Sequence, residues 1–302
     1  MKPWQIYLRG VLMGAADLVP GISGGTVAFI TGIYPRLINS LRSFDLKLWA
    51  VWKKEGFAGI FKAVDAVFLV TLLAGILSSL LVLAHLISWL ISSFPLHLNG
   101  LFFGLVAGSA VIISREMGGW TLSQLFFMLL GAFIATFISL LLPSIGSITP
   151  LTFFFAGMVA ICAMILPGIS GSFLLLTLGL YGPLIEAVKS FNLVFLGAFA
   201  AGAGLGLLAF SHLLGWLFDH FKAATFATLF GFVIASLKHI WPWQMLSSYR
   251  MSEQGEMVPL ETQVLPPWAF TEITNQSSHL LTVLLLMLVG LLLVIYMGSK
   301  NN

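Results

Sequence analysis

Charged residues are scarce in this chain. They make up 8% of its 302 residues, whereas 59% are hydrophobic, and the mean hydropathy is +1.03. Soluble globular domains carry Asp, Glu, Lys or Arg at roughly a quarter of their positions. The composition therefore excludes a soluble domain and predicts an all-α polytopic membrane protein.

Cysteine is nearly absent. The single Cys162 lies in an apolar run, which excludes a disulfide framework and is typical of a small buried side chain. The sequence also lacks clusters of cysteine, histidine and carboxylate, so we expect neither a metal nor a cofactor. The formal net charge of +3 gives no reason to expect a nucleic-acid partner, because Lys and Arg in apolar chains usually set membrane topology.

The pentapeptide Pro-Gly-Ile-Ser-Gly occurs twice, each time inside an apolar segment. Residues 18–44 align without gaps with residues 165–191 at a constant offset of 147, and both ranges contain the pentapeptide. Further along, the offset falls to 127 and pairs Gly75 with Gly202. The chain is therefore an internal duplication.

The duplication predicts two repeats, 1–146 and 147–302, each with one insertion. The insertion at 45–63 mixes Trp and Phe with Lys, which predicts an amphipathic helix on an anionic membrane surface. The insertion at 238–279 is rich in Glu and Pro and predicts an aqueous loop. Apolar runs suited to crossing a membrane lie at 64–91, 98–114, 121–142, 193–218, 223–237 and 280–298.

The broken segments decide the topology. If each is a re-entrant hairpin, at about 5–35 and 153–184, each half holds three full transmembrane helices and the second half is inverted. All basic residues except Lys189, Lys238 and Arg250 then share one face with both termini. Full crossing by both segments distributes the basic residues less unevenly. The positive-inside rule thus favours the inverted repeat, with the N- and C-termini in the cytoplasm.

Each broken segment has the composition of an anion site. A short helix that follows a break begins with unpaired backbone N–H groups at the positive end of its dipole, and glycines let a ligand approach them. The alternative is that Gly and Pro only produce closely packed kinks. The candidate anion ligands are Gly21, Ser23, Gly24, Gly25 and Thr26 in the first copy and Gly168, Ser170, Gly171 and Ser172 in the second. Since the copies differ in sequence, they need not bind equally.

Charged residues near these segments are candidates for coupling or gating. Asp17 precedes the first copy and has Met164 at the matching position of the second. An intramembrane carboxylate can carry a proton, bind a cation, pair with Arg9 or cap the hairpin helix. Arg115 and Lys238 end related helices and serve either as gate cations or as interfacial anchors.

Two stretches resemble the signature of a known family. GAADLVPGISGGTVAFITGIY at 14–34 and ILPGISGSFLLLTLGLY at 165–181 are similar to the bacterial polyprenyl-phosphate transporter family, formerly a domain of unknown function. The resemblance implies translocation of undecaprenyl phosphate from the outer to the inner leaflet of the cytoplasmic membrane, for recycling in envelope synthesis, without an enzymatic step. It implies a polyprenyl-phosphate lipid and membrane lipids as partners and leaves a homo-oligomer open.

Two other functions share parts of this pattern. Undecaprenyl-pyrophosphate phosphatases have a similar layout with a PGxSRSG loop, but Gly24 and Gly25 stand where that loop carries Arg and Ser. The charge neutralisation that phosphoryl transfer requires is therefore missing. A transporter of a soluble anion would use the same helix termini and is the other alternative.

Overall fold

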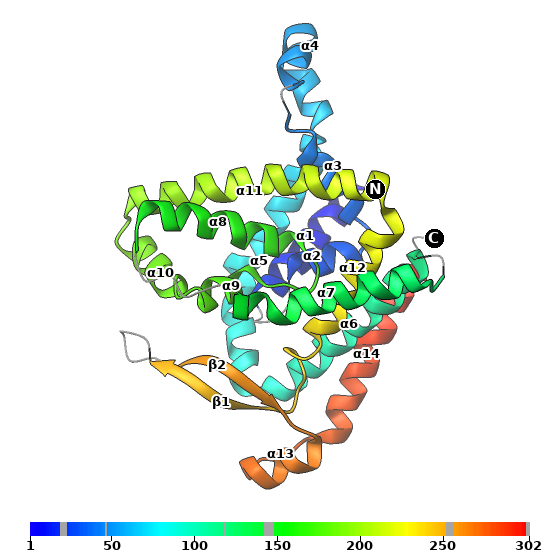
Figure 1. Ribbon diagram of the computed structural model, residues 1–302, viewed down its shortest axis with the longest axis vertical. Coiled ribbons are helices and arrows are strands. Elements are labelled where there is room, and N and C mark those ends of the chain that lie inside the picture. The colour runs from blue at the N-terminus through cyan, green and yellow to red at the C-terminus, as the bar shows by residue number, and fades with distance from the viewer. Residues whose placement is uncertain (19–22, 46, 118, 142–147, 252–256, 300–302) are drawn as a thin grey trace.

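The computed structural model describes residues 1–18, 23–45, 47–117, 119–141, 148–251 and 257–299 (Figure 1). The first half contains α1 (Pro3–Asp17), α2 (Gly24–Ile30), α3 (Tyr34–Arg42), α4 (Leu48–Ala63), α5 (Ala66–Ser93), α6 (Pro95–Glu116) and α7 (Leu122–Leu141). The second half contains α8 (Pro150–Ile165), α9 (Gly171–Thr177), α10 (Tyr181–Lys189), α11 (Leu193–His220), α12 (Lys222–Ser236), β1 (Gln244–Met251), β2 (Met257–Val264), α13 (Pro267–Thr274) and α14 (Leu280–Ser299). The expected boundary at 146–147 falls outside the described residues.

Helices of the two halves begin at matching residues. α1 and α8 both start on a proline, Pro3 and Pro150, where the missing N–H costs nothing. α5 and α11 are each 28 residues long, and their starts are separated by the same offset that aligns their sequences. The order of broken segment, long helix and following helices is therefore the same in both halves.

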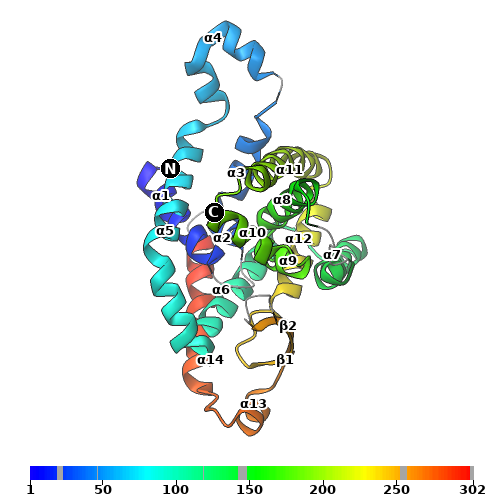
Figure 2. The ribbon, with the colours of Figure 1, turned by 90° about the vertical axis from the view of Figure 1, so that its left-hand side faces the viewer.

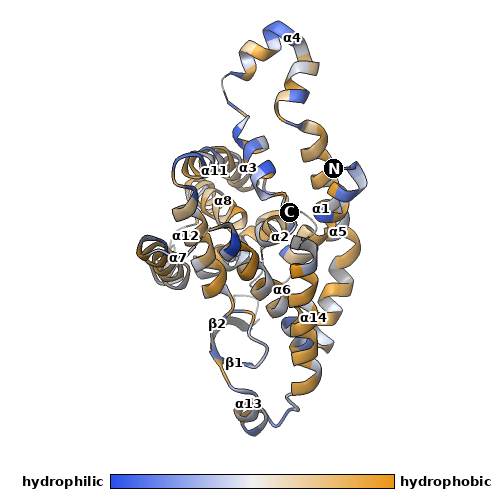
Figure 3. Ribbon diagram, turned by 90° about the vertical axis from the view of Figure 1, so that its right-hand side faces the viewer, coloured by the Kyte–Doolittle hydropathy of each residue, from blue (hydrophilic) through white to orange (hydrophobic). Residues whose placement is uncertain are grey.

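Apolar helices account for the membrane character of the chain. By length and composition, α5, α6 and α11 can cross a membrane, and α7, α8, α12 and α14 contain shorter apolar stretches. The hydropathy colouring shows this character along α5 and α14 (Figure 3). All six predicted apolar runs fall on helices, so the prediction of a helical membrane protein is confirmed.

Matching helices also pack in matching pairs. α1 lies along α5 and α8 along α11, whereas α6 packs against α14 and α12 against α7. The last helix of each half thus packs into the other half. These crossings are close: a Cβ at Gly104 would collide with the Met287 carbonyl, and one at Gly231 with the Met128 carbonyl. Small residues at a helix crossing let the two backbones approach closely. Such packing helps to hold helices together in a membrane, where no hydrophobic effect drives their association.

The second insertion contains more structure than the expected loop. β1 and β2 pair as an antiparallel hairpin, and α13 follows. Trp243 is buried with Leu265, Phe270 and Val283, and its indole N–H donates to the Ser278 carbonyl at 2.8 Å. This small aromatic core orders part of the segment for which Pro and Glu predict an aqueous loop.

The two insertions lie at opposite ends of the molecule. α4 projects beyond the start of α5, and α13 lies at the far end of the long axis (Figures 1 and 2). The first insertion is helical, as expected, with a break at Gly56. The two insertions therefore mark the two ends of the long axis of the molecule.

Candidate functional site

The two broken segments are hydrogen-bonded to each other. The Ser23 hydroxyl donates to the Met164 carbonyl at 2.8 Å, and the Gly168 N–H donates to Thr26 Oγ1 at 2.9 Å. Ser23 and Thr26 are both 1% exposed, so these bonds are shielded from solvent. The candidate ligand Gly21 lies outside the described residues, and its role stays a prediction.

Glycine is required where the two segments touch. A Cβ at Gly25 would lie 2.5 Å from the Ile165 carbonyl oxygen and 2.7 Å from that of Met164, well inside contact distance. Gly168 has φ +86°, a left-handed conformation that glycine adopts at little cost. Close packing on the second segment thus accounts for Gly25, whereas Gly168 is required by its backbone conformation and by the Phe232 carbonyl oxygen, which would lie 2.7 Å from a Cβ.

The start of α2 has its donors occupied by the protein itself. The Gly24 N–H donates to Asp17 Oδ1 at 2.7 Å, and the Gly25 N–H donates to the Ser23 hydroxyl at 3.1 Å. The Thr26 N–H donates to the Ser23 carbonyl at 2.9 Å. The Asp17 carboxyl group thus occupies the position that an anion would take at the start of α2. This hydrogen bond supports the predicted role of Asp17 as a cap of the hairpin helix.

Arg9 does not join this group in the described structure. Its Nε is buried and has no hydrogen-bond partner among the described residues, and no ion pair with Asp17 occurs there. At the matching position, α8 carries Ala156. Arg9 therefore brings a cationic side chain to a place that is apolar in the second half.

The second broken segment exposes one of its two hydroxyl groups, that of Ser172, whereas Ser170 is half-buried. Ser170 Oγ and Ser172 Oγ lie 2.9 Å apart and share a hydrogen bond, and Ser172 is exposed while Gly171 is buried. This contrasts with the buried Ser23 and Thr26. The two copies therefore differ in access: the described residues of the first are closed by protein groups, and the second has the Ser172 hydroxyl at the surface.

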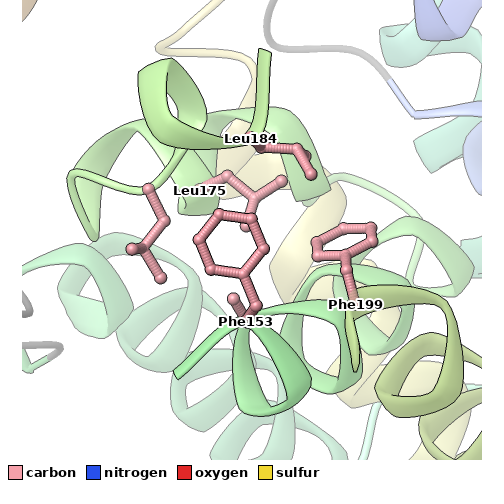
Figure 4. Close-up of a pocket in the computed structure, with 6 residues that line it drawn as sticks. Phe153, Leu175, Leu184 and Phe199 are labelled. Carbon is pink, nitrogen blue, oxygen red and sulfur yellow. The ribbon is translucent and has the colours of Figure 1, made fainter. Parts of the chain in front are cut away.

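An apolar pocket lies beside α9 and does not hold phosphate-binding groups. It is bounded by α8, α9, α10 and α11 and is too narrow to hold a water molecule (Figure 4). Its lining consists of Phe153, Ala156, Leu175, Leu180, Leu184 and Phe199. Since none of these side chains carries a hydrogen-bond donor or a charge, the pocket offers no ligand for a charged head group.

An ion pair that the sequence analysis did not identify joins the two halves. Arg42 on α3 contacts Asp219 on α11, with Nη1 2.6 Å from Oδ2. The Arg42 side chain lies over Gly215, where a Cβ would be 2.6 Å from its Cδ. At the offset of 127, Asp219 matches the uncharged Ser92, and this charge difference between the repeats is the signal in the sequence that could have identified the pair.

Tyrosines at matching positions lie in opposite environments. Tyr34 is 1% exposed and packs against Phe29 and against Phe218 of α11, with ring centroids 5.4 and 6.1 Å apart. Tyr181 on α10 is 40% exposed. Together with the ion pair, this shows that α3 is docked across the repeat boundary, whereas its counterpart presents the matching side chain to the surroundings.

The predicted gate cations Arg115 and Lys238 stay apart from the motif contacts. Arg115 lies in the last turn of α6 and Lys238 follows α12, and both side chains are exposed. Neither makes an ion pair with a residue that the structure describes. Over the same part of the chain, no three His, Cys, Asp or Glu side chains form a group suited to a metal.

Comparison with known proteins assigns the family. Residues 13–258 match the model of a family described as undecaprenyl phosphate translocase-like. The chain belongs to this family. This translocase-like chain is 45% identical over 295 residues to the polyprenyl-phosphate transporter of Vibrio cholerae serotype O1, covering 98% of this chain and 96% of that protein.

A second relative is more distant. The polyprenyl-phosphate transporter of Staphylococcus aureus is 31% identical over 258 residues, which cover 79% of this chain and 86% of that protein. No solved structure matches the translocase-like chain significantly. The family resemblance read from the two Pro-Gly-Ile-Ser-Gly segments is thus confirmed.

The capping role of Asp17 predicts different effects for two substitutions. Asp17→Ala removes the acceptor of the Gly24 N–H and should lower the free energy of unfolding by about 1 kcal/mol. Asp17→Asn keeps an oxygen acceptor and should stay close to the parent protein. Thermal unfolding in detergent measures both. Equal destabilisation by the two variants would assign the effect to the charge instead of the cap.

Proposed function

We propose that this protein moves a polyprenyl phosphate, undecaprenyl phosphate in the first instance, across the bacterial cytoplasmic membrane without chemical change. The observation that carries the proposal is the junction of two broken helices, one closed by protein groups and one with the Ser172 hydroxyl exposed. The names of both relatives support the substrate class. The phosphate would use the polar junction while the isoprenoid tail stays in lipid.

The proposed architecture is an inverted repeat with two re-entrant hairpins. α1 has 15 residues and α2 has 7, so neither reaches the roughly 20 residues that a full crossing needs. α2 packs back against α1, and α9 packs back against α8, as a hairpin requires. The exchange of α7 and α14 between the halves and the location of the insertions at opposite ends also favour inversion.

The proposed orientation puts α4 on the cytoplasmic side. Lys47, Lys53, Lys54 and Lys62 lie in or next to α4, whereas α13 at the opposite end has Glu272 and no basic residue. α14 runs from α13 toward the α4 end (Figure 1). By the positive-inside rule, both termini would then be cytoplasmic.

The phosphate would bind first at the second broken segment. Its ligands would be the hydroxyls of Ser170 and Ser172. Gly168 and Gly171 would place the backbone of this segment, since a Cβ at either would lie within 2.7 Å of a protein carbonyl oxygen. Ser23, Gly24, Gly25, Thr26 and Gly21 would form the matching site once the junction opens. In the described conformation their identified donors bond to Asp17, Ser23 and Met164 instead.

Asp17 is the proposed coupling group. Its oxygen holds the Gly24 N–H, and an arriving phosphate would compete for the same donor. Protonation of the carboxyl group would weaken this bond and release the start of α2. A proton gradient is therefore the driving force that we favour, and Arg9 is the nearest sequence candidate to assist in charge balance.

Docking of α3 on α11 is the proposed gate. The Arg42–Asp219 pair and buried Tyr34 close the junction between α3 of the first half and α11 of the second. The corresponding α10 packs on its own half and lacks a partner charge at Ser92. If α3 and α10 exchanged their docked and undocked states, the junction would open toward one side of the membrane and close toward the other. Arg115 and Lys238 are further candidates for gate cations, one at each exit.

A flux assay tests the transport proposal. Purified protein in liposomes should move a fluorescent short-chain polyprenyl phosphate between leaflets and release no inorganic phosphate. Replacing both Ser170 and Ser172 with Ala should slow this flux about tenfold or more, since hydrogen bonds to a charged group contribute about 1.5–3 kcal/mol. Ser78→Ala is the matched control because its hydroxyl donates to the Ala74 carbonyl of its own helix, away from the broken segments.

Three outcomes would contradict the proposal. Phosphate release would favour the phosphatase alternative, and flux of inorganic phosphate without lipid flux would favour a soluble-anion transporter. Lipid flux equal in the double variant and in the control would remove the two hydroxyls from the binding site.

The gate predicts a local change in hydrogen exchange. Arg42→Ala removes a partly exposed pair that contributes at most about 1 kcal/mol, so amide exchange in α3 should accelerate up to about fivefold. α10 provides the internal control and should not change. The swap Arg42→Asp with Asp219→Arg should restore slow exchange. If the amides of α3 exchange at the same rate in the parent protein and in all variants, the Arg42–Asp219 pair does not keep α3 docked on α11.

A further inference from the structure

α4 has no counterpart in the second half. There, α10 is followed by α11 after only residues 190–192, whereas residues 43–65 separate α3 from α5. α4 projects from the helical body and contacts the beginning of α5 (Figures 1 and 2). The transport proposal makes no use of this segment, so its exposed chemistry needs a separate explanation.

The segment is folded into a hook. Its helical conformation is broken at Gly56, which has φ +63°, and the two parts, 48–55 and 57–63, turn back on each other. Gly59 is buried, and a Cβ there would collide with Glu55 and come within 3.0 Å of Val51. This contact fixes the two parts together, and we name residues 48–63 the α4 hook.

Aromatic rings gather on the outside of the α4 hook. Trp49 lies 4.8 Å from Trp52 between ring centroids, and Trp52 lies 6.2 Å from Phe57 across the break. Phe57 is 73% exposed and Phe61 59%. Trp and other aromatic rings concentrate at the level of lipid head groups, where their apolar area and polar edges both find partners.

Basic residues outnumber acidic ones in and next to the α4 hook. Lys53 Nζ lies 5.3 Å from the centroid of the Trp49 ring, and Lys47, Lys54 and Lys62 outnumber the single acid, Glu55. At the base of the hook, Arg36 Nε holds Asp65 Oδ2 at 2.7 Å, just before α5 begins. The hook is thus fixed at the end of a membrane-crossing helix, with a positive and aromatic surface exposed.

We propose that the α4 hook binds the anionic head-group layer of the membrane face at which α5 begins. The aromatic rings insert between head groups, and the lysines neutralise lipid phosphates. The charge is complementary to acidic phospholipid, and the attachment at the start of α5 keeps the hook at head-group depth. The proposal concerns bulk anionic phospholipid and does not rest on the transport reaction.

A fluorescent label at Phe61 tests this contact in the full-length protein. Phe61→Cys, made in a Cys162→Ala background and labelled with an environment-sensitive dye, is placed in nanodiscs of phosphatidylcholine alone or of phosphatidylcholine with phosphatidylglycerol at three to one. The label should report a less polar environment with phosphatidylglycerol. Exchange of Lys53, Lys54 and Lys62 for Glu should abolish the difference, since each lysine contributes about fivefold to binding.

Controls separate charge from simple insertion. High salt should reverse the shift, because the Debye length falls to about 3 Å at 1 M. A label at Trp268→Cys, on exposed α13 without basic residues, should not respond. An equal shift in neutral nanodiscs would overturn the anionic-lipid assignment. A Phe61 label that reports an aqueous environment in both lipid compositions would also overturn the proposal. The surface of the α4 hook would then fit a protein partner instead of lipid.

Discussion

A helix that breaks inside a membrane must satisfy its freed backbone groups within the protein, because hydrocarbon supplies no hydrogen bonds. In the part of this chain that the structure describes, two hydrogen bonds join the segments that contain the breaks. A hydroxyl of the first segment bonds to the backbone before the second, and a backbone N–H of the second bonds to a hydroxyl of the first. The two halves are thereby held together at their polar centre.

Several features depend on this mutual bonding. Gly25 has to lack a side chain because two carbonyls of the other half lie against it. Asp17 supplies the remaining acceptor at the start of α2, where an external anion would otherwise be attractive. In the proposed cycle, phosphate competes for the groups that close the junction. Substrate binding and junction closure would then oppose each other, which is the property that a carrier needs.

The two repeats share one fold but differ in how α3 and α10 are packed. α3 carries a buried tyrosine and a charge pair to the other half, whereas α10 presents its tyrosine outward. Two copies of one sequence pattern can differ in this way only if the molecule rests in one of two exchangeable arrangements or if the copies have diverged. The absence of a charge at Ser92 indicates divergence, so the two proposed arrangements would differ in stability.

The local sequence pattern was sufficient to predict the long helices but not the contacts between the two halves. Hydropathy and the repeated offset predicted α5, α6, α7, α11, α12 and α14 and the helical insertion, because these depend on neighbouring residues. The bonds of Ser23 and Thr26 and the Arg42–Asp219 pair join residues more than a hundred positions apart, which no local period encodes. Glycine was also ambiguous, since Gly25 suits both an anion and a close backbone. Trp243 and Phe270 ordered a segment whose Pro and Glu content indicated only a loop.

The most direct test of the account is a structure with a short-chain polyprenyl phosphate bound. The account predicts phosphate oxygens within hydrogen-bonding distance of the hydroxyls of Ser170 and Ser172, with their mutual bond broken. Phosphate bound elsewhere, with these two hydroxyls still bonded to each other, would contradict it.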